Sequence, residues 1–111
     1  MTEVRGPGFI TATVRFGKHG TFAYFRGQTK VETRARVRAR VWYHSIVTIH
    51  LASRTYDWRL TTTTGRVILA VRNVPWRQRG PAIPVVDSTC LRTPVGGPGI
   101  GIDWNDYIVR R

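Results

Sequence analysis

A row of arginines between residues 30 and 41 is the pattern in this sequence that best fits a chemical task. Arginine alternates there with valine, alanine or threonine, and every second side chain of a β-strand lies on the same face. Such neighbours are about 6.6 to 6.8 Å apart, which is comparable to the phosphate spacing of an extended nucleic-acid strand. The row consists of Lys30, Arg34, Arg36, Arg38 and Arg40. Because the planar guanidinium suits phosphate and carboxylate, we expect the row to face an anionic partner.

Charge balance supports an external partner for this row. The first 80 residues hold 15 basic side chains against three acidic ones, Glu3, Glu32 and Asp57. Glu32 lies within the row but cannot neutralise four arginines, and Trp42 continues the row in phase with an aromatic surface on which a base could stack. The partner is either nucleic acid or an acidic surface of a neighbouring subunit. A merely solvated sheet face, which shows the same alternation, is the alternative.

A second basic cluster surrounds Trp76. It consists of Arg72, Trp76, Arg77 and Arg79, and the prolines at positions 75 and 81 predict an exposed loop there. A tryptophan among arginines can stack on a base, or it can be an anchor buried in its own core or at a subunit interface. We favour the anchor.

Residues for catalysis or metal binding are sparse. The three histidines have no ligand spacing, and Cys90 alone fits a small core residue better than a nucleophile. A metal-independent ribonuclease, using His44 or His50 beside the arginines, is the least implausible enzyme. We therefore expect no enzyme, no metal, no cofactor and no small-molecule substrate.

Composition limits the class of protein. The chain has 111 residues, of which 41% are hydrophobic, and carries a net charge of +12, which together predict one folded domain. No apolar run is long enough to cross a membrane, and the N-terminal residues lack the apolar segment of a signal peptide. We expect a protein of the virion or host cytoplasm that is not secreted by a signal peptide.

The hydrophobic pattern predicts an all-β fold. Alternation with a period of two, broken by glycine and proline, predicts about six to seven short antiparallel strands in a small barrel or sandwich. The expected strands cover residues 9–16, 21–26, 29–43, 46–53, 54–62 and 66–74, with a possible edge strand over 82–86. The first two strands form one hairpin, and residues 54–74 form another around a turn at 63–65.

The C-terminal part has a different composition. We assign residues 1–95 to the β-domain and 96–111 to a glycine-rich loop followed by an aromatic tail, whose apolar residues include Trp104, Tyr107 and Ile108. Such a tail either closes the domain as a final strand or packs on another subunit, and we favour the second.

Together these features predict a non-enzymatic assembly subunit of a larger complex. Its partners are other protein subunits, in a homo-oligomer or a hetero-assembly, and DNA or RNA is a further candidate. By analogy with small arginine-rich β-domains, a phage capsid or head-to-tail connector protein is the expected setting. The alternative is a freestanding nucleic-acid-binding β-barrel.

Overall fold

The computed structural model describes residues 2–6, 8–16, 20–38, 40–82, 84 and 88–91. These segments form eight β-strands and no helix. The strands are β1 (Thr2–Gly6), β2 (Phe9–Phe16), β3 (Thr21–Arg26), β4 (Thr29–Arg36), β5 (Tyr43–His50), β6 (Thr55–Thr62), β7 (Val67–Pro75) and β8 (Ser88–Leu91).

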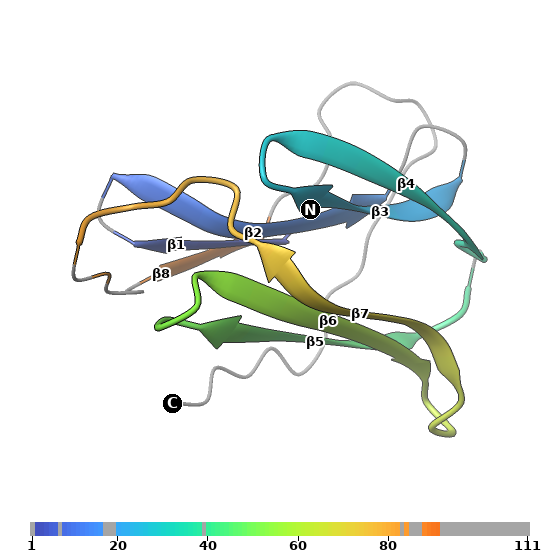
Figure 1. The fold of residues 1–111 in the computed structure, drawn as a ribbon. Helices are drawn as coiled ribbons and strands as arrows, with labels where there is room; N and C mark the ends of the chain where they lie inside the picture. The colour runs from blue at the N-terminus through green and yellow to red at the C-terminus, as the bar shows by residue number, and fades with distance from the viewer. Residues whose placement is uncertain are drawn as a thin grey trace.

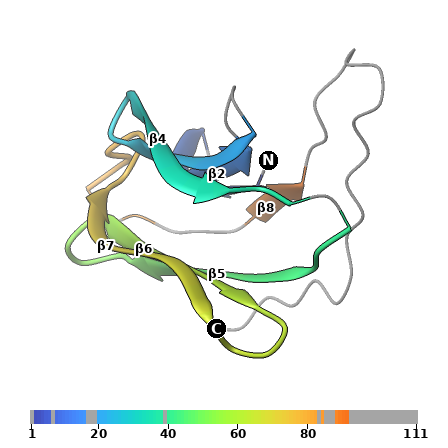
Figure 2. The same ribbon diagram turned by 90° about the vertical axis from the view of Figure 1, so that its right-hand side faces the viewer.

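All strand pairs are antiparallel and belong to two sheets. One sheet has the order β4-β3-β2-β1-β8, and the other has the order β5-β6-β7. The two sheets lie face to face, with the connection from β4 to β5 descending from one to the other at one end (Figures 1 and 2). The predicted all-β fold is confirmed, and it takes the form of a sandwich rather than a closed barrel.

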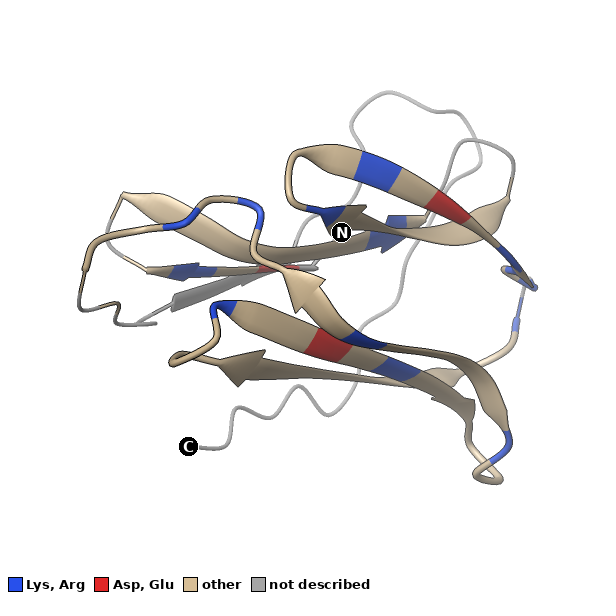
Figure 3. Ribbon diagram, viewed as in Figure 1, with Lys and Arg blue, Asp and Glu red and all other residues tan. Residues whose placement is uncertain are grey.

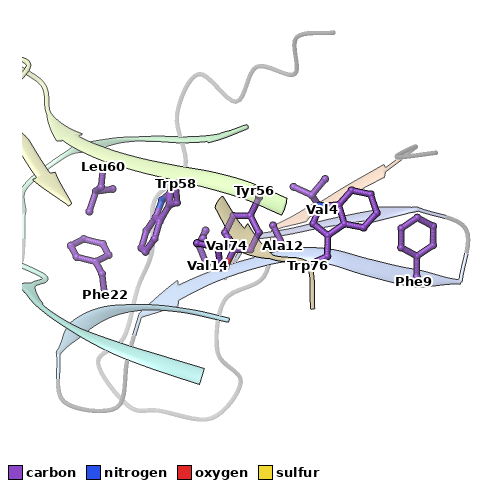
Figure 4. Close-up of a cluster of buried hydrophobic side chains, with 10 residues drawn as sticks. All are labelled: Val4, Phe9, Ala12, Val14, Phe22, Tyr56, Trp58, Leu60, Val74 and Trp76. Carbon is purple, nitrogen blue, oxygen red and sulfur yellow. The ribbon is translucent and has the colours of Figure 1, made fainter. Parts of the chain in front are cut away.

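The core lies between the sheets and is rich in aromatic side chains (Figure 4). On β6, the predicted alternation places Tyr56, Trp58 and Leu60 inward, where each is at most 2% exposed. Phe22 on β3 meets Trp58 edge-on across the sandwich, at 6.2 Å between ring centroids. Edge-to-face pairs of this kind stabilise a core beyond the area that they bury, so the Phe22–Trp58 pair helps to hold the two sheets together.

The predicted strand over 29–43 is wrong in its length. β4 ends at Arg36, and β5 begins only at Tyr43. Between them Arg40 has a positive φ of 60°, which a strand does not allow. The chain turns here because it leaves one sheet and enters the other. The uninterrupted alternation of arginine with small apolar residues concealed this break.

The strand predicted over 46–53 is shifted, since β5 runs from Tyr43 to His50. Other boundaries agree more closely. β2 and β3 have the predicted ranges, and the predicted turn at 63–65 joins β6 to β7. The strands β1 and β8, which pair with each other, were not predicted. Of the expected edge strand at 82–86, the structure describes only Ala82 and Pro84, and neither lies in a strand.

After Pro75 the chain crosses from the sheet of β7 to the sheet of β2. The backbone N–H of Arg77 donates to the carbonyl of Thr11 at 2.7 Å, and that of Gln78 donates to Ile10 at 2.9 Å. This part of β2 is free because β3 pairs with β2 only from Val14 to Phe16. The crossing places Trp76 in the core, so an exposed loop is the wrong prediction for this residue.

Trp76 is the buried anchor that we favoured, and it lies in the core of its own chain. Its ring stacks on Phe9 with 5.9 Å between centroids, and it is 4% exposed. The indole N–H donates to the carbonyl of Thr55 at 2.9 Å. At the crossing, the Trp76 side chain therefore contacts both sheets, through Phe9 on β2 and through Thr55 on β6.

Candidate anion-binding pocket

A pocket of about 450 Å³ lies where the end of β4 faces the β6–β7 hairpin. Its walls come from both sheets and from the connection between them. The lining residues are Arg34, Arg36, Arg38, Val41, Tyr43, Thr62, Arg66 and Ile68. Three of the five predicted row residues are thus brought together, and Arg66 joins them from a distant part of the chain.

The first wall is positioned by β4 and the segment after it. On β4 the exposed Arg34 and Arg36 alternate with the half-buried Thr33 and Ala35, as a strand with one buried face requires. After β4, the N–H of Val37 donates to the carbonyl of Gly20 at 2.8 Å. This bond carries the exposed–buried alternation beyond the last strand residue, so the next arginine still lies on the outer side.

Tyr43 braces the connection that carries the third arginine. The backbone N–H of Arg38 donates to the Tyr43 hydroxyl at 3.1 Å, which closes the loop between β4 and β5. The Tyr43 ring in turn packs edge-on against Phe22, at 5.1 Å between centroids. The pocket wall is therefore anchored to the core through one tyrosine.

The opposite wall is the turn between β6 and β7. The N–H of Thr62 donates to the Arg66 carbonyl at 2.9 Å, and the N–H of Arg66 donates to the Thr62 hydroxyl at 3.1 Å. Gly65 has a φ of 92°, a conformation that favours glycine. This turn fixes the backbone of Arg66 at the mouth of the pocket. The turn was predicted, but the approach of Arg66 to β4 could not be deduced from local pattern.

The pocket has a strongly positive lining. Four of its eight lining residues are arginines, and none of the eight is acidic. Glu32, the acid on β4, contacts Lys30 at 2.7 Å and accepts a hydrogen bond from Thr21 at 3.2 Å. Basic segments gather at the end of β4 and along the connection toward β5 (Figure 3). A concave surface lined by one sign of charge concentrates its field and attracts anions.

The other two residues of the row, Lys30 and Arg40, and Trp42, which continues it, take different positions. Lys30 is half-buried beside Glu32, and Arg40 is exposed in the left-handed turn without lining the pocket. Trp42 is 51% exposed and lies between two lining residues, Val41 and Tyr43. The prediction that one strand carries all four arginines is therefore wrong, although three of them still meet at one site.

The second predicted cluster does not form a single surface. Arg77 lies over the ring of Phe25 at 3.9 Å from the centroid, and one of its terminal nitrogens is 3.2 Å from the Thr13 hydroxyl. The same nitrogen is 3.8 Å from the carboxylate of the buried Glu3. Arg72 and Arg79 are exposed. With Trp76 in the core, Arg77 has a structural role on the outer face of the larger sheet.

The two histidines that the structure describes, His44 and His50, do not line the pocket. His44 is exposed on β5, and Nε2 of His50 is 2.9 Å from the Asp57 carboxylate. The backbone N–H of Asn73 and the His50 ring both hydrogen-bond to Asp57 and hold the pKa of that carboxyl below its usual value. Across the described part of the chain, no three His, Cys, Asp or Glu residues gather into a possible metal site. Among the described residues, neither histidine lies with the arginines that line the pocket.

Comparisons with known proteins give no assignment. No family model matches the chain, and searches of curated proteins and of solved structures found no match. Among the described residues, no helix has the length and apolar character to span a membrane. Trp104, Tyr107 and Ile108 of the predicted interface tail lie outside the described residues. The fold and the pocket therefore carry the functional argument.

Proposed function

We propose that this chain is a non-enzymatic assembly subunit that binds nucleic-acid phosphates through the basic pocket. One observation carries the proposal: four arginines, from β4, from the β4–β5 connection and from the β6–β7 turn, line one pocket, and none of its lining residues is acidic. Guanidinium groups held around a hollow fit a phosphate, which accepts several charge-assisted hydrogen bonds at once. Their mutual repulsion is relieved when the anion binds.

One feature favours nucleic acid over an acidic protein surface. Trp42 is half exposed and lies in the chain between the lining residues Val41 and Tyr43, and an exposed aromatic beside a cationic groove suits a base that follows the bound phosphate. Acidic neighbouring subunits remain the second candidate partner. The virion setting, in a capsid or connector, stays a prediction, as does location in the virion or host cytoplasm.

Fluorescence anisotropy with labelled single- and double-stranded oligonucleotides tests the pocket over a range of salt concentrations. The variant Arg36→Gln/Arg66→Gln removes one arginine from each side of the pocket. Each phosphate contact contributes about 0.7 to 0.9 to the slope of log affinity against log salt. Loss of two contacts should therefore flatten the slope by about 1.4 to 1.8 and weaken binding at low salt.

A matched control separates the pocket from general charge. Arg26→Gln/Arg59→Gln removes the same charge from two exposed arginines, again one in each sheet and neither in the pocket lining. Its slope should stay near that of the unmodified protein. Equal slopes for the two variants would show that charge alone matters, and absence of any oligonucleotide binding would exclude nucleic acid as the partner.

A further inference from the structure

Exposed large hydrophobic residues are concentrated around the edge strand β5. Val41 is 43% exposed, Trp42 51%, Ile46 55% and Leu51 46%, and all four lie on β5 or within two residues of its ends. Only one other large hydrophobic residue among those described is comparably exposed, Val67 at 48%. Among the described strands, β5 has a neighbour on one side only, β6.

The other edges carry features that prevent pairing, and β5 does not. The edge strand β4 carries four charged residues, β8 is only four residues long, and β7 contains two register shifts, a positive φ at Asn73 and a terminal proline. β5 contains no charged residue, glycine or proline, and its eight residues pair with β6 in unbroken register. Natural proteins protect exposed edges by charge, proline, bulges or short length. A regular edge without such protection presents unpaired N–H and C=O groups, which are a template for pairing with another strand.

We propose that β5 pairs antiparallel with β5 of a second copy of this chain. The two three-stranded sheets then form one six-stranded sheet around a two-fold axis. A second copy is the occupant that fits this edge, because β5 has no Lys, Arg, Asp or Glu and no charged side chain of one β5 faces another in an antiparallel pair of two such strands. The net charge of +12 on each chain opposes self-association, so the contact must avoid the arginine-rich surfaces, as pairing through β5 does.

The exposed side chains indicate the register. His44, Ile46, Thr48 and His50 lie on the outer face, opposite Thr61, Arg59, Asp57 and Thr55 of β6. With the two-fold axis at Ile46, the two Ile46 side chains face each other at about 4.5 to 5.5 Å between Cβ atoms. In the same register His44 faces Thr48 of the second copy. Ile46, the most exposed large hydrophobic side chain among the described residues, thereby gains a partner.

This inference deepens the assembly part of the proposed function and does not depend on the pocket. The experiment is light scattering on a sizing column over a range of protein concentrations. High salt and removal of nucleic acid are required, since a bound oligonucleotide could bridge two copies. We expect a dimer, or a multiple of it, for the unmodified chain. A monomer at every concentration would overturn the pairing while leaving the anisotropy result for the pocket unaffected.

Two variants test the strand itself. Ile46→Lys places two positive charges opposite each other at the axis and should weaken self-association at least about tenfold. Val67→Lys makes the same change at a similarly exposed position on β7, the other edge strand of the sheet, and should leave the mass distribution unchanged. If both variants or neither dissociate the dimer, β5 is not the contact.

Cross-linking tests the register directly. In a background with Cys90→Ser, Ile46→Cys should form a disulfide-linked dimer on mild oxidation because the two side chains are adjacent across the axis. Thr48→Cys, on the same face but away from the axis, should link far less. Equal linking by the two variants, or none, would overturn the proposed pairing.

Discussion

Removal of the Trp76 side chain should test the placement of this residue in the core. The ring is 4% exposed, stacks on Phe9, and donates a 2.9 Å hydrogen bond to the carbonyl of Thr55. Replacing a buried tryptophan by alanine removes apolar contacts and leaves a cavity, which costs about 3–5 kcal/mol. Domains of this size have a free energy of unfolding of about 5–15 kcal/mol. Trp76→Ala should therefore remove a large part of the total stability.

Two comparison variants separate the contributions. Trp76→Phe retains an aromatic ring but leaves the Thr55 carbonyl without its donor, and loss of that partner costs about 1–3 kcal/mol. Trp42→Ala changes a tryptophan that is 51% exposed, so its effect on unfolding should stay within about 0.5 kcal/mol. If Trp42 stacks on a base, its removal should instead weaken oligonucleotide binding by about 1–3 kcal/mol.

Urea unfolding followed by far-ultraviolet circular dichroism is the appropriate assay, because the substitutions themselves alter tryptophan fluorescence. We expect the loss of stability to be largest for Trp76→Ala, smaller for Trp76→Phe and smallest for Trp42→Ala. A free energy of unfolding for Trp76→Ala within about 1 kcal/mol of the unmodified protein would refute the buried position. The surface-stacking interpretation of Trp76 would then be restored.

Two further perturbations have defined outcomes. Gly80 has a φ of +75°, and a Cβ there would lie 2.9 Å from Phe9 ring carbons, whereas at Gly20 (φ +71°) a Cβ would meet nothing within 4 Å. Gly80→Ala should therefore reduce stability by about 1–3 kcal/mol more than Gly20→Ala in urea unfolding, and equal losses would contradict the close approach to Phe9. The lowered pKa of Asp57 contributes stability that is fully present above the unfolded pKa of about 3.9 and is lost as pH falls through the folded pKa. The stability difference between the unmodified protein and Asp57→Asn should narrow as the solution is acidified below about pH 4, and a difference independent of pH in that range would exclude the effect.

The local sequence pattern was sufficient to predict the strands that are bounded by glycine or by a turn. β2, β3 and β6 each show alternation that ends at glycine or at a turn, and the inward face of β6 follows from its period of two. The turn at 63–65 was equally visible, because two threonines and a glycine follow a strand. For the candidate site, the local pattern indicated Arg34, Arg36 and Arg38, and the anionic partner that it predicts for them stays a prediction.

Tertiary structure decided where the arginine row ends and what it meets. The alternation from Lys30 to Val41 is uniform, so nothing local distinguishes Arg36, the last residue of β4, from Arg40 with its positive φ. The break exists because the chain must reach the second sheet, and Tyr43 secures that crossing through its hydroxyl.

The packing of the two sheets also explains the positions of Arg66 and Trp76. Arg66 reaches the pocket through the stacking of one sheet on the other, and Trp76 enters the core because β3 leaves part of β2 unpaired. Both depend on which segments lie side by side in space. The alternation of side chains is a property of each strand, whereas the packing of two sheets is a property of the whole chain. Only the packing of the sheets determines where Arg66 and Trp76 lie.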